Sequence, residues 1–131
     1  MQALRAAAAD LVWVLAFAII GRRSHAGVSD ATRLFDAAGV LHTAWPFLTG
    51  CLAGLLASRF WRQPDSLRTG VIVWLCTLTL GVLLRLVSGE TAQLSFLVVT
   101  AVFLASGVLG WRAVTRTVRR ASARRTSAER L

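Results

Sequence analysis

Four apolar blocks divide this sequence, and each is close to the length that an α-helix needs to cross a lipid bilayer. About 20 residues suffice, because a helix rises about 1.5 Å per residue and the hydrocarbon layer is about 30 Å thick. The blocks cover about residues 4–21, 40–58, 69–87 and 92–111. A helix also satisfies its own backbone hydrogen bonds inside lipid. We therefore predict an all-α, polytopic membrane protein with four transmembrane helices.

The composition favours lipid as the solvent of these blocks. Hydrophobic residues make up 56% of the chain and the mean hydropathy is +0.62, which is too apolar for an ordinary soluble domain. The spans leave little chain for a catalytic domain outside the membrane. Cys51 and Cys76 lie inside two of the blocks, where we expect reduced packing residues and no disulfide.

Short connections predict that the helices form an antiparallel bundle. Only residues 88–91 join the last two spans, and Gly89 suits the left-handed residue that ends many helices. Residues 62–65, Arg-Gln-Pro-Asp, are a turn signal between the second and third spans. In the polar stretch 22–39, Ser29 and Asp30 are candidates to cap a short helix on the membrane surface or leading into the second span.

The distribution of arginine predicts the orientation. All fifteen basic residues are Arg, and seven of them lie in the last twenty residues. Positive charge beside a span marks the cytoplasmic side, so we place both the N and C termini in the cytoplasm of a multi-pass protein of the inner (plasma) membrane. Without the tail the arginines divide evenly between the two sides. Trp61 and Trp111 then lie at the inner interface and Trp45 near the outer one.

The tail sets the boundary between two predicted parts of the chain. Residues 1–112 form the transmembrane domain, and residues 113–131 form an Arg-rich cytoplasmic tail, disordered or held on the membrane surface by anionic headgroups. A net charge of +9 in a soluble protein would suggest nucleic acid. The aromatic residues between basic ones that bind single strands are missing, so we expect no nucleic-acid partner.

The first block has a second interpretation, a cleaved signal peptide. Arg5 would be its charged start, residues 11–20 its apolar core and Ser24-His25-Ala26 its cleavage site. Asp10 before the core and Arg22-Arg23 just before the cut argue against cleavage. We therefore favour a retained span.

Basic residues near the outer face are exceptions to the charge rule and are our candidate ligand-binding residues. Arg22 and Arg23 end the first span, and His25 lies in the loop that follows it. His42 is one turn into the second span, and Arg85 lies in the last turn of the third. Converging cations suit a carboxylate, a phosphate or a lipid headgroup.

Another interpretation assigns these arginines no ligand. Arg22 and Arg23 would then extend to anionic headgroups, and Arg85 would pair with Glu90 or with a helix carbonyl.

Asp10, about two turns into the first span, is a possible coupling carboxylate. An acidic residue in a first helix can couple transport to protons or cations, as in small four-helix multidrug exporters. Those exporters place the carboxylate deeper, and the rest of this pattern does not resemble theirs. The simpler interpretation is that Asp10 complements the positive N-terminal end of its own helix.

Small residues predict close helix contacts, within the bundle or between protomers. Gly50 and Gly54 form a G-x-x-x-G pattern, and Gly81, Gly107 and Gly110 are similar notches. A four-span chain of 14.1 kDa makes a thin pathway alone, so we expect a homo-oligomer or a partner in a membrane complex.

The residues do not predict an enzyme. No nucleophile–base pair, phosphate loop or pair of carboxylates is recognisable. His25 and His42 could in principle ligate haem or a metal, but one lies in a loop and no carboxylate–His pair accompanies them. We expect no cofactor and no metal.

Several stretches are familiar when taken together and in order. They are Asp10-Leu-Val-Trp13 with Phe17, Gly21-Arg-Arg-Ser-His25, Thr43-Ala-Trp-Pro-Phe47, Gly81 with Arg85, and Gly110-Trp-Arg112. In this order and spacing the chain resembles an uncharacterised family of small prokaryotic membrane proteins, domain of unknown function 3054. The resemblance implies a four-span membrane protein and no known activity.

The leading hypothesis from the residues is a module that binds or transports an anionic solute or lipid headgroup at the outward Arg/His cluster. The alternative is an accessory or structural subunit that packs against a larger membrane complex through Gly50/Gly54 and Gly107/Gly110. A third hypothesis is a haem-binding redox helper.

Overall fold

The computed structural model describes the backbone of residues 1–25 and 37–129, and the side chains of residues 1–21 and 37–128. This part of the chain forms four helices: α1 (Gln2–His25), α2 (Ala37–Ala57), α3 (Leu67–Val87) and α4 (Leu94–Glu129). Each is long and apolar enough to cross a membrane. The predicted all-α, four-span fold is therefore confirmed, although the predicted cap at Ser29-Asp30 lies outside the described residues.

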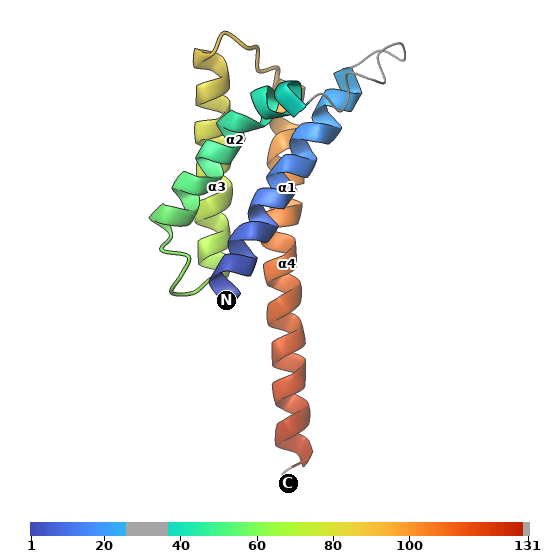
Figure 1. Ribbon diagram of the computed structural model, residues 1–131. Coiled ribbons are helices and arrows are strands. Elements are labelled where there is room, and N and C mark those ends of the chain that lie inside the picture. Colours follow the sequence, from blue (N-terminus) through green and yellow to red (C-terminus); the bar gives the residue numbers. More distant parts are fainter. Residues whose placement is uncertain (26–36, 130–131) are drawn as a thin grey trace.

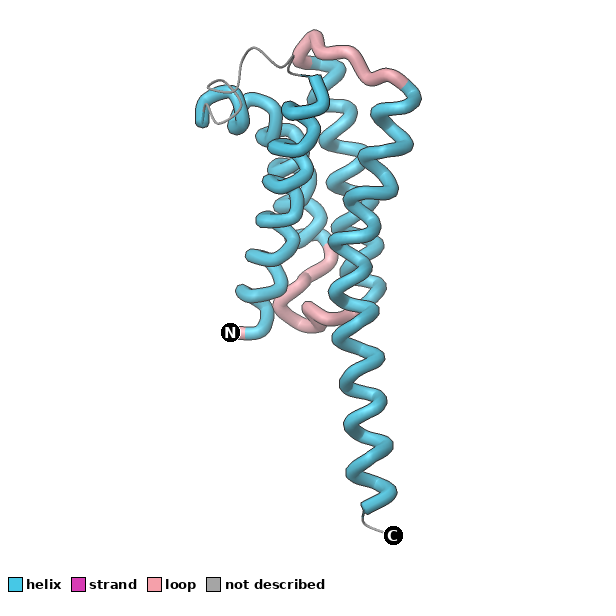
Figure 2. The backbone as a smooth tube through the Cα atoms, turned by 90° about the vertical axis from the view of Figure 1, so that its right-hand side faces the viewer, coloured by secondary structure: helices cyan, strands magenta, loops and turns pink. Residues whose placement is uncertain are grey.

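The helices run alternately up and down and close into a ring (Figure 1). α1 packs on α2 and α4, and α3 packs on the same two helices. Both ends of the chain lie at one end of the bundle, and α4 extends far beyond the other three helices (Figures 1 and 2). The predicted antiparallel bundle is confirmed; the membrane side on which the termini lie stays a prediction.

Left-handed residues end α2 and α3. Gly89 has a φ of +82°, the Gly89 N–H donates to the carbonyl of Leu86 and the Glu90 N–H donates to that of Arg85. This is the Schellman arrangement, and it confirms the helix stop predicted at Gly89. α2 ends in the same way with Arg59 at a φ of 50°, a conformation that disfavours side chains with a Cβ.

Pro46 interrupts the backbone hydrogen bonding of α2, since it has no N–H to donate to His42 four residues earlier. The first turns of α2 lie across the end of the bundle, and the rest of the helix descends along α3 (Figures 1 and 2). His42 lies on the first part and is exposed.

A cluster of aromatic and branched side chains fills the centre of the bundle. Phe17 and Phe47 pack edge to face with ring centroids 5.2 Å apart, and Trp13 stacks on Phe103 at 5.1 Å. Large apolar side chains also cover the outside of all four helices, among them Val12, Leu52, Leu56, Leu75, Leu83, Val98 and Val102. Such exposure suits lipid and not water.

Four of the five predicted packing glycines are used within the chain. A Cβ on Gly50 would lie 2.9 Å from the Cα of Thr77, and one on Gly54 would lie 2.7 Å from the Cα of Val73, so α2 and α3 touch backbone to backbone. The places where a Cβ would fall on Gly81 and Gly107 are filled by Phe47 and Trp13, respectively.

This finding corrects the idea that Gly50, Gly54 and Gly107 form docking faces for a partner. Those faces are already covered by the chain itself, because a backbone contact of this kind leaves no room for a second helix. Of the five predicted packing glycines, Gly110 alone has open space where a Cβ would lie.

Residues 113–129 of the Arg-rich tail are helical in the structure, where a disordered or surface-lying segment was expected. α4 continues without a break to Glu129. Residues 111–129 contain no Gly or Pro, and Ala and Arg are among the strongest helix formers. The helix propensity of these residues predicts a helix, but the charge of the tail led us to expect a disordered or surface-lying segment.

Candidate functional site

Asp10 of α1 and Arg112 of α4 form an ion pair that is enclosed within the bundle. Their relative exposures are 1% and 0%. Arg112 Nη1 donates to Asp10 Oδ1 at 2.8 Å and Nη2 donates to Oδ2 at 2.6 Å. Two parallel hydrogen bonds of this length are the strongest form of an Arg–carboxylate contact.

Neighbouring groups satisfy the rest of this pair. Arg112 Nε donates to the Pro64 carbonyl at 3.0 Å, and Nη1 also donates to the Val108 carbonyl at 2.7 Å. The Trp111 indole N–H donates to Asp10 Oδ1 at 3.0 Å. Because Gly70 has no side chain, Arg112 has room beside α3. The pair thus ties α1 and α4 to the turn before α3.

The position of Asp10 therefore has a different cause from the one favoured above. Its carboxylate is neutralised by the Arg112 guanidinium, and the positive N-terminal end of its own helix is not its main partner. Arg112 and Trp111 are the members of this site that the sequence interpretation missed, because it placed Trp111 at the inner interface and counted Arg112 among the cytoplasmic arginines. The available signal was a carboxylate inside a span, which requires a buried counter-charge, and an arginine at the same end of the last span.

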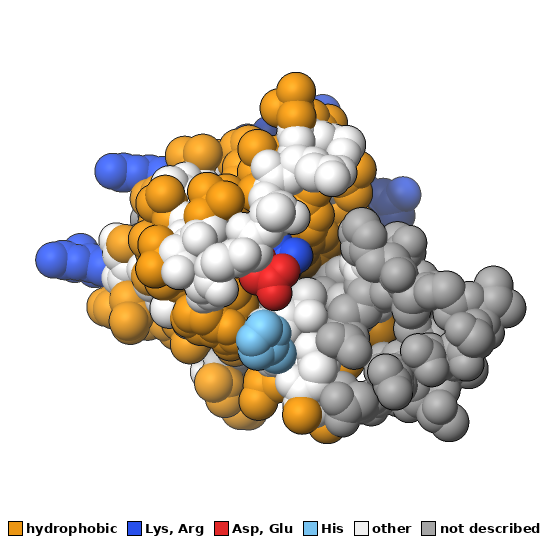
Figure 3. Space-filling model, turned by 90° about the horizontal axis from the view of Figure 1, so that it is seen from above, with side chains coloured by type: hydrophobic (Ala, Val, Ile, Leu, Met, Phe, Trp, Pro, Cys, Tyr) orange, Lys and Arg blue, Asp and Glu red, His pale blue; other side chains and the backbone are white. Residues whose placement is uncertain are grey.

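The predicted outward cluster lies at the opposite end of the bundle. The last turns of α1, with Arg22, Arg23 and His25, end beside the first turns of α2 (Figure 1), but these three side chains lie outside the described residues. Viewed onto this end, a histidine lies next to an acidic side chain, with a basic one behind (Figure 3).

Arg85 is held among local partners. Its Nη2 lies 3.4 Å from Glu90 Oε2 and its Nε lies 3.4 Å from the Thr91 carbonyl oxygen. Its guanidinium lies 5.0 Å from the centre of the Phe96 ring, and the side chain is 20% exposed. The predicted pairing of Arg85 with Glu90 is therefore present, and the guanidinium still reaches the surface.

The described residues contain two free cysteines and no cluster of metal-binding side chains. Cys51 and Cys76 are free thiols. Among the described side chains of residues 1–21 and 37–128, no three of His, Cys, Asp or Glu come close enough together to hold a metal ion.

The four long, apolar helices define the chain as an all-helical integral membrane protein with four spans. The family model described as "Protein of unknown function (DUF3054)" matches residues 7–115, and the chain belongs to this family. The matched range includes Asp10, Trp111 and Arg112. No curated protein and no solved structure gives a significant match.

Proposed function

We propose that this membrane protein binds an anion, either a small anionic solute or a lipid headgroup, at the end of the bundle where α1 ends, α2 begins and α3 ends. The supporting observation is that these helix ends bring Arg22, Arg23 and Arg85 to one end of the molecule. Among the described residues there, Glu90 is the only carboxylate. Guanidinium groups suit carboxylate and phosphate ligands in geometry and charge.

Arg85 is the residue best prepared for this role. Its distances to Glu90 and Thr91 are 3.4 Å, longer than the 2.7–2.9 Å or so of a strong charge-assisted hydrogen bond. Its Nη1 has no partner among the described residues, so an anion can be bound without breaking a short contact. The Phe96 ring under the guanidinium keeps the group in place. His42, exposed at the same end, is a second candidate donor.

The test is a thermal-shift series on the detergent-solubilised protein with inorganic phosphate, acetate and short-chain phosphatidylglycerol. A ligand bound at this site at ten times its Kd should stabilise the protein by about 1.4 kcal/mol, and Arg85→Gln should remove the part of the shift that this site contributes. Arg116→Gln removes the same charge near the other end of the bundle and is the matched control. If Arg85→Gln and Arg22→Gln leave every shift intact, the proposal is wrong.

A second candidate function, an accessory subunit, is supported by α4. Beyond the bundle this helix presents its own exposed surface, with Arg120, Arg124 and Arg125 along it, and such a surface suits an acidic partner. In an accessory subunit, this part of α4 would contact the partner, because the helix faces at Gly50, Gly54 and Gly107 are covered within the chain. The mass of the complex extracted in mild detergent distinguishes the two functions, because an accessory subunit remains with its partner and shows no ligand shift.

A further inference from the structure

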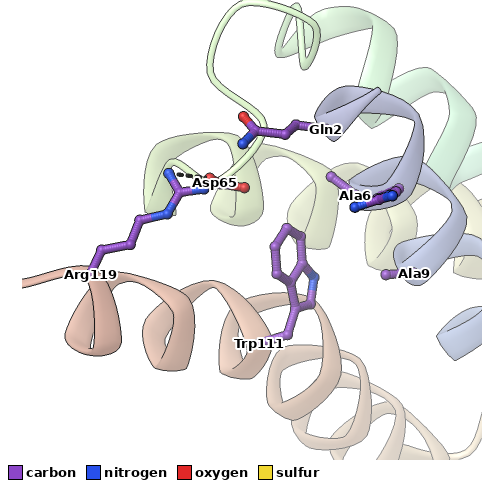
Figure 4. Close-up of a pocket in the computed structure, with 7 residues that line it drawn as sticks. Gln2, Ala6, Ala9, Asp65, Trp111 and Arg119 are labelled. Carbon is purple, nitrogen blue, oxygen red and sulfur yellow. Dashed lines mark ion pairs between the residues drawn. The ribbon is translucent and has the colours of Figure 1, made fainter. Parts of the chain in front are cut away.

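A pocket of about 320 Å³ lies at the end of the bundle opposite the outward cluster. Its polar lining comes from three elements: Gln2 and Arg5 from α1, Asp65 from the turn before α3, and Trp111 and Arg119 from α4 (Figure 4). Alanines of α1 form the rest of the wall. The volume is at the lower end of the range for small-molecule sites, enough for a single charged headgroup.

The charges of this pocket do not balance. Arg119 Nη1 lies 2.8 Å from Asp65 Oδ2, and the two side chains are 57% and 22% exposed. Arg5 is exposed and has no ion-pair partner among the described residues. Two guanidinium groups against one carboxylate leave a net positive charge, and the exposed ion pair can rearrange at little energetic cost.

The buried ion pair behind the pocket does not oppose an anion. Asp10 is neutralised by Arg112, so no uncompensated negative charge lies behind the wall. The Trp111 indole N–H is bound to Asp10, which fixes the ring, and its nitrogen lies on the side of Ala9 (Figure 4). The pocket therefore has a fixed wall at Trp111 and a positively charged wall at Arg5 and Arg119.

The pocket lies where apolar surface gives way to charge. Leu4 and Val12 are exposed on α1, whereas the arginines of α4 that reach the surface begin beyond Trp111, at Arg116 and Arg119. Tryptophan and arginine are enriched at the headgroup level of membranes. A phospholipid with its acyl chains along the apolar part of α1 would place its phosphate at this height.

We propose that this pocket binds the phosphate group of an anionic phospholipid, with Arg5 and Arg119 as bidentate donors and Gln2 as a neutral one. Guanidinium groups match phosphate oxygens in geometry and charge, and anionic lipids gather at cationic segments beside spans. The site is at the other end of the bundle from Arg85, so it stands or falls independently of the proposed function.

Native mass spectrometry of the full chain in mild detergent tests this proposal, with added phosphatidylglycerol, phosphatidylcholine or glycerol phosphate. We expect a phosphatidylglycerol adduct that weakens about tenfold in Arg5→Gln and in Arg119→Gln, one charge-assisted contact being lost in each. Asp65→Asn should tighten the adduct, because it frees Arg119. Arg124→Gln/Arg125→Gln removes charge from the far part of α4 and should leave the adduct unchanged.

Three results would overturn the proposal. With every variant made in the Arg85→Gln background, an adduct that survives Arg5→Gln/Arg119→Gln places the lipid elsewhere, and an equal loss in the Arg124→Gln/Arg125→Gln control indicates diffuse attraction to the tail. Binding of glycerol phosphate without phosphatidylglycerol assigns the pocket to a soluble phosphate ester. The substituted arginines are exposed, so helix content by circular dichroism serves to confirm that each variant is folded.

Discussion

At the scale of single residues, the chain offers two aspartate–arginine pairs in opposite environments. Asp10–Arg112 is enclosed by protein, whereas Asp65–Arg119 is partly exposed to solvent. Removing two charges from water costs several kcal/mol per ion, and only good geometry with every remaining group satisfied offsets that loss. The buried pair meets this condition through Pro64, Val108 and Trp111.

This contrast predicts the effect of removing each carboxylate. Asp10→Asn leaves Arg112 buried without a counter-charge and should destabilise the fold by about 3–5 kcal/mol. Asp65→Asn, the matched control, should change stability by about 0–1 kcal/mol. Unfolding in mixed micelles of rising dodecyl sulfate content measures both. Equal changes in the two variants would show that the buried pair has no special role in stability.

At the scale of helices, the contact of α2 with α3 depends on backbone atoms meeting directly. Gly54→Ala would press its Cβ against the Cα of Val73, which cannot move without separating the helices, so we expect a loss of about 1–3 kcal/mol. Gly110→Ala meets open space and should stabilise α4 by up to about 1 kcal/mol. The same micelle titration compares them. A harmless Gly54→Ala would mean that α2 and α3 do not approach this closely.

At the scale of the whole molecule, an even number of spans brings both termini to one side, and the arginines predict that this side is the cytoplasm. A membrane-impermeant maleimide tests the orientation in intact cells. Thr91→Cys should react at once, and Ser127→Cys only after the membrane is opened. The native chain is the background control, since Cys51 and Cys76 lie within spans. Labelling of Ser127→Cys in sealed cells would reverse the orientation.

The sequence by itself determined the features that depend on one stretch of chain. The four spans follow from hydropathy, because lipid cannot supply hydrogen bonds and each segment must satisfy its own backbone. The stop at Gly89 follows from its freedom to adopt a positive φ. The Arg85–Glu90 pair is equally local, since its partners are five residues apart. The helix of the tail also depends on one stretch of chain, but we did not predict it, because the charge of the tail suggested a disordered or surface-lying segment.

The tertiary structure alone decided which distant residues meet. Asp10 and Arg112 are 102 positions apart. A carboxylate inside a span requires a counter-charge, but nothing in either helix specifies which of the arginines supplies it. Gly107 and Trp13 also fit together only because α1 lies against α4. Hydropathy favours each helix in lipid, but it does not favour one neighbouring helix over another, because lipid is as apolar as the helices themselves. The choice of neighbours therefore depends on shape and on buried polar partners, which exist only once the bundle has formed.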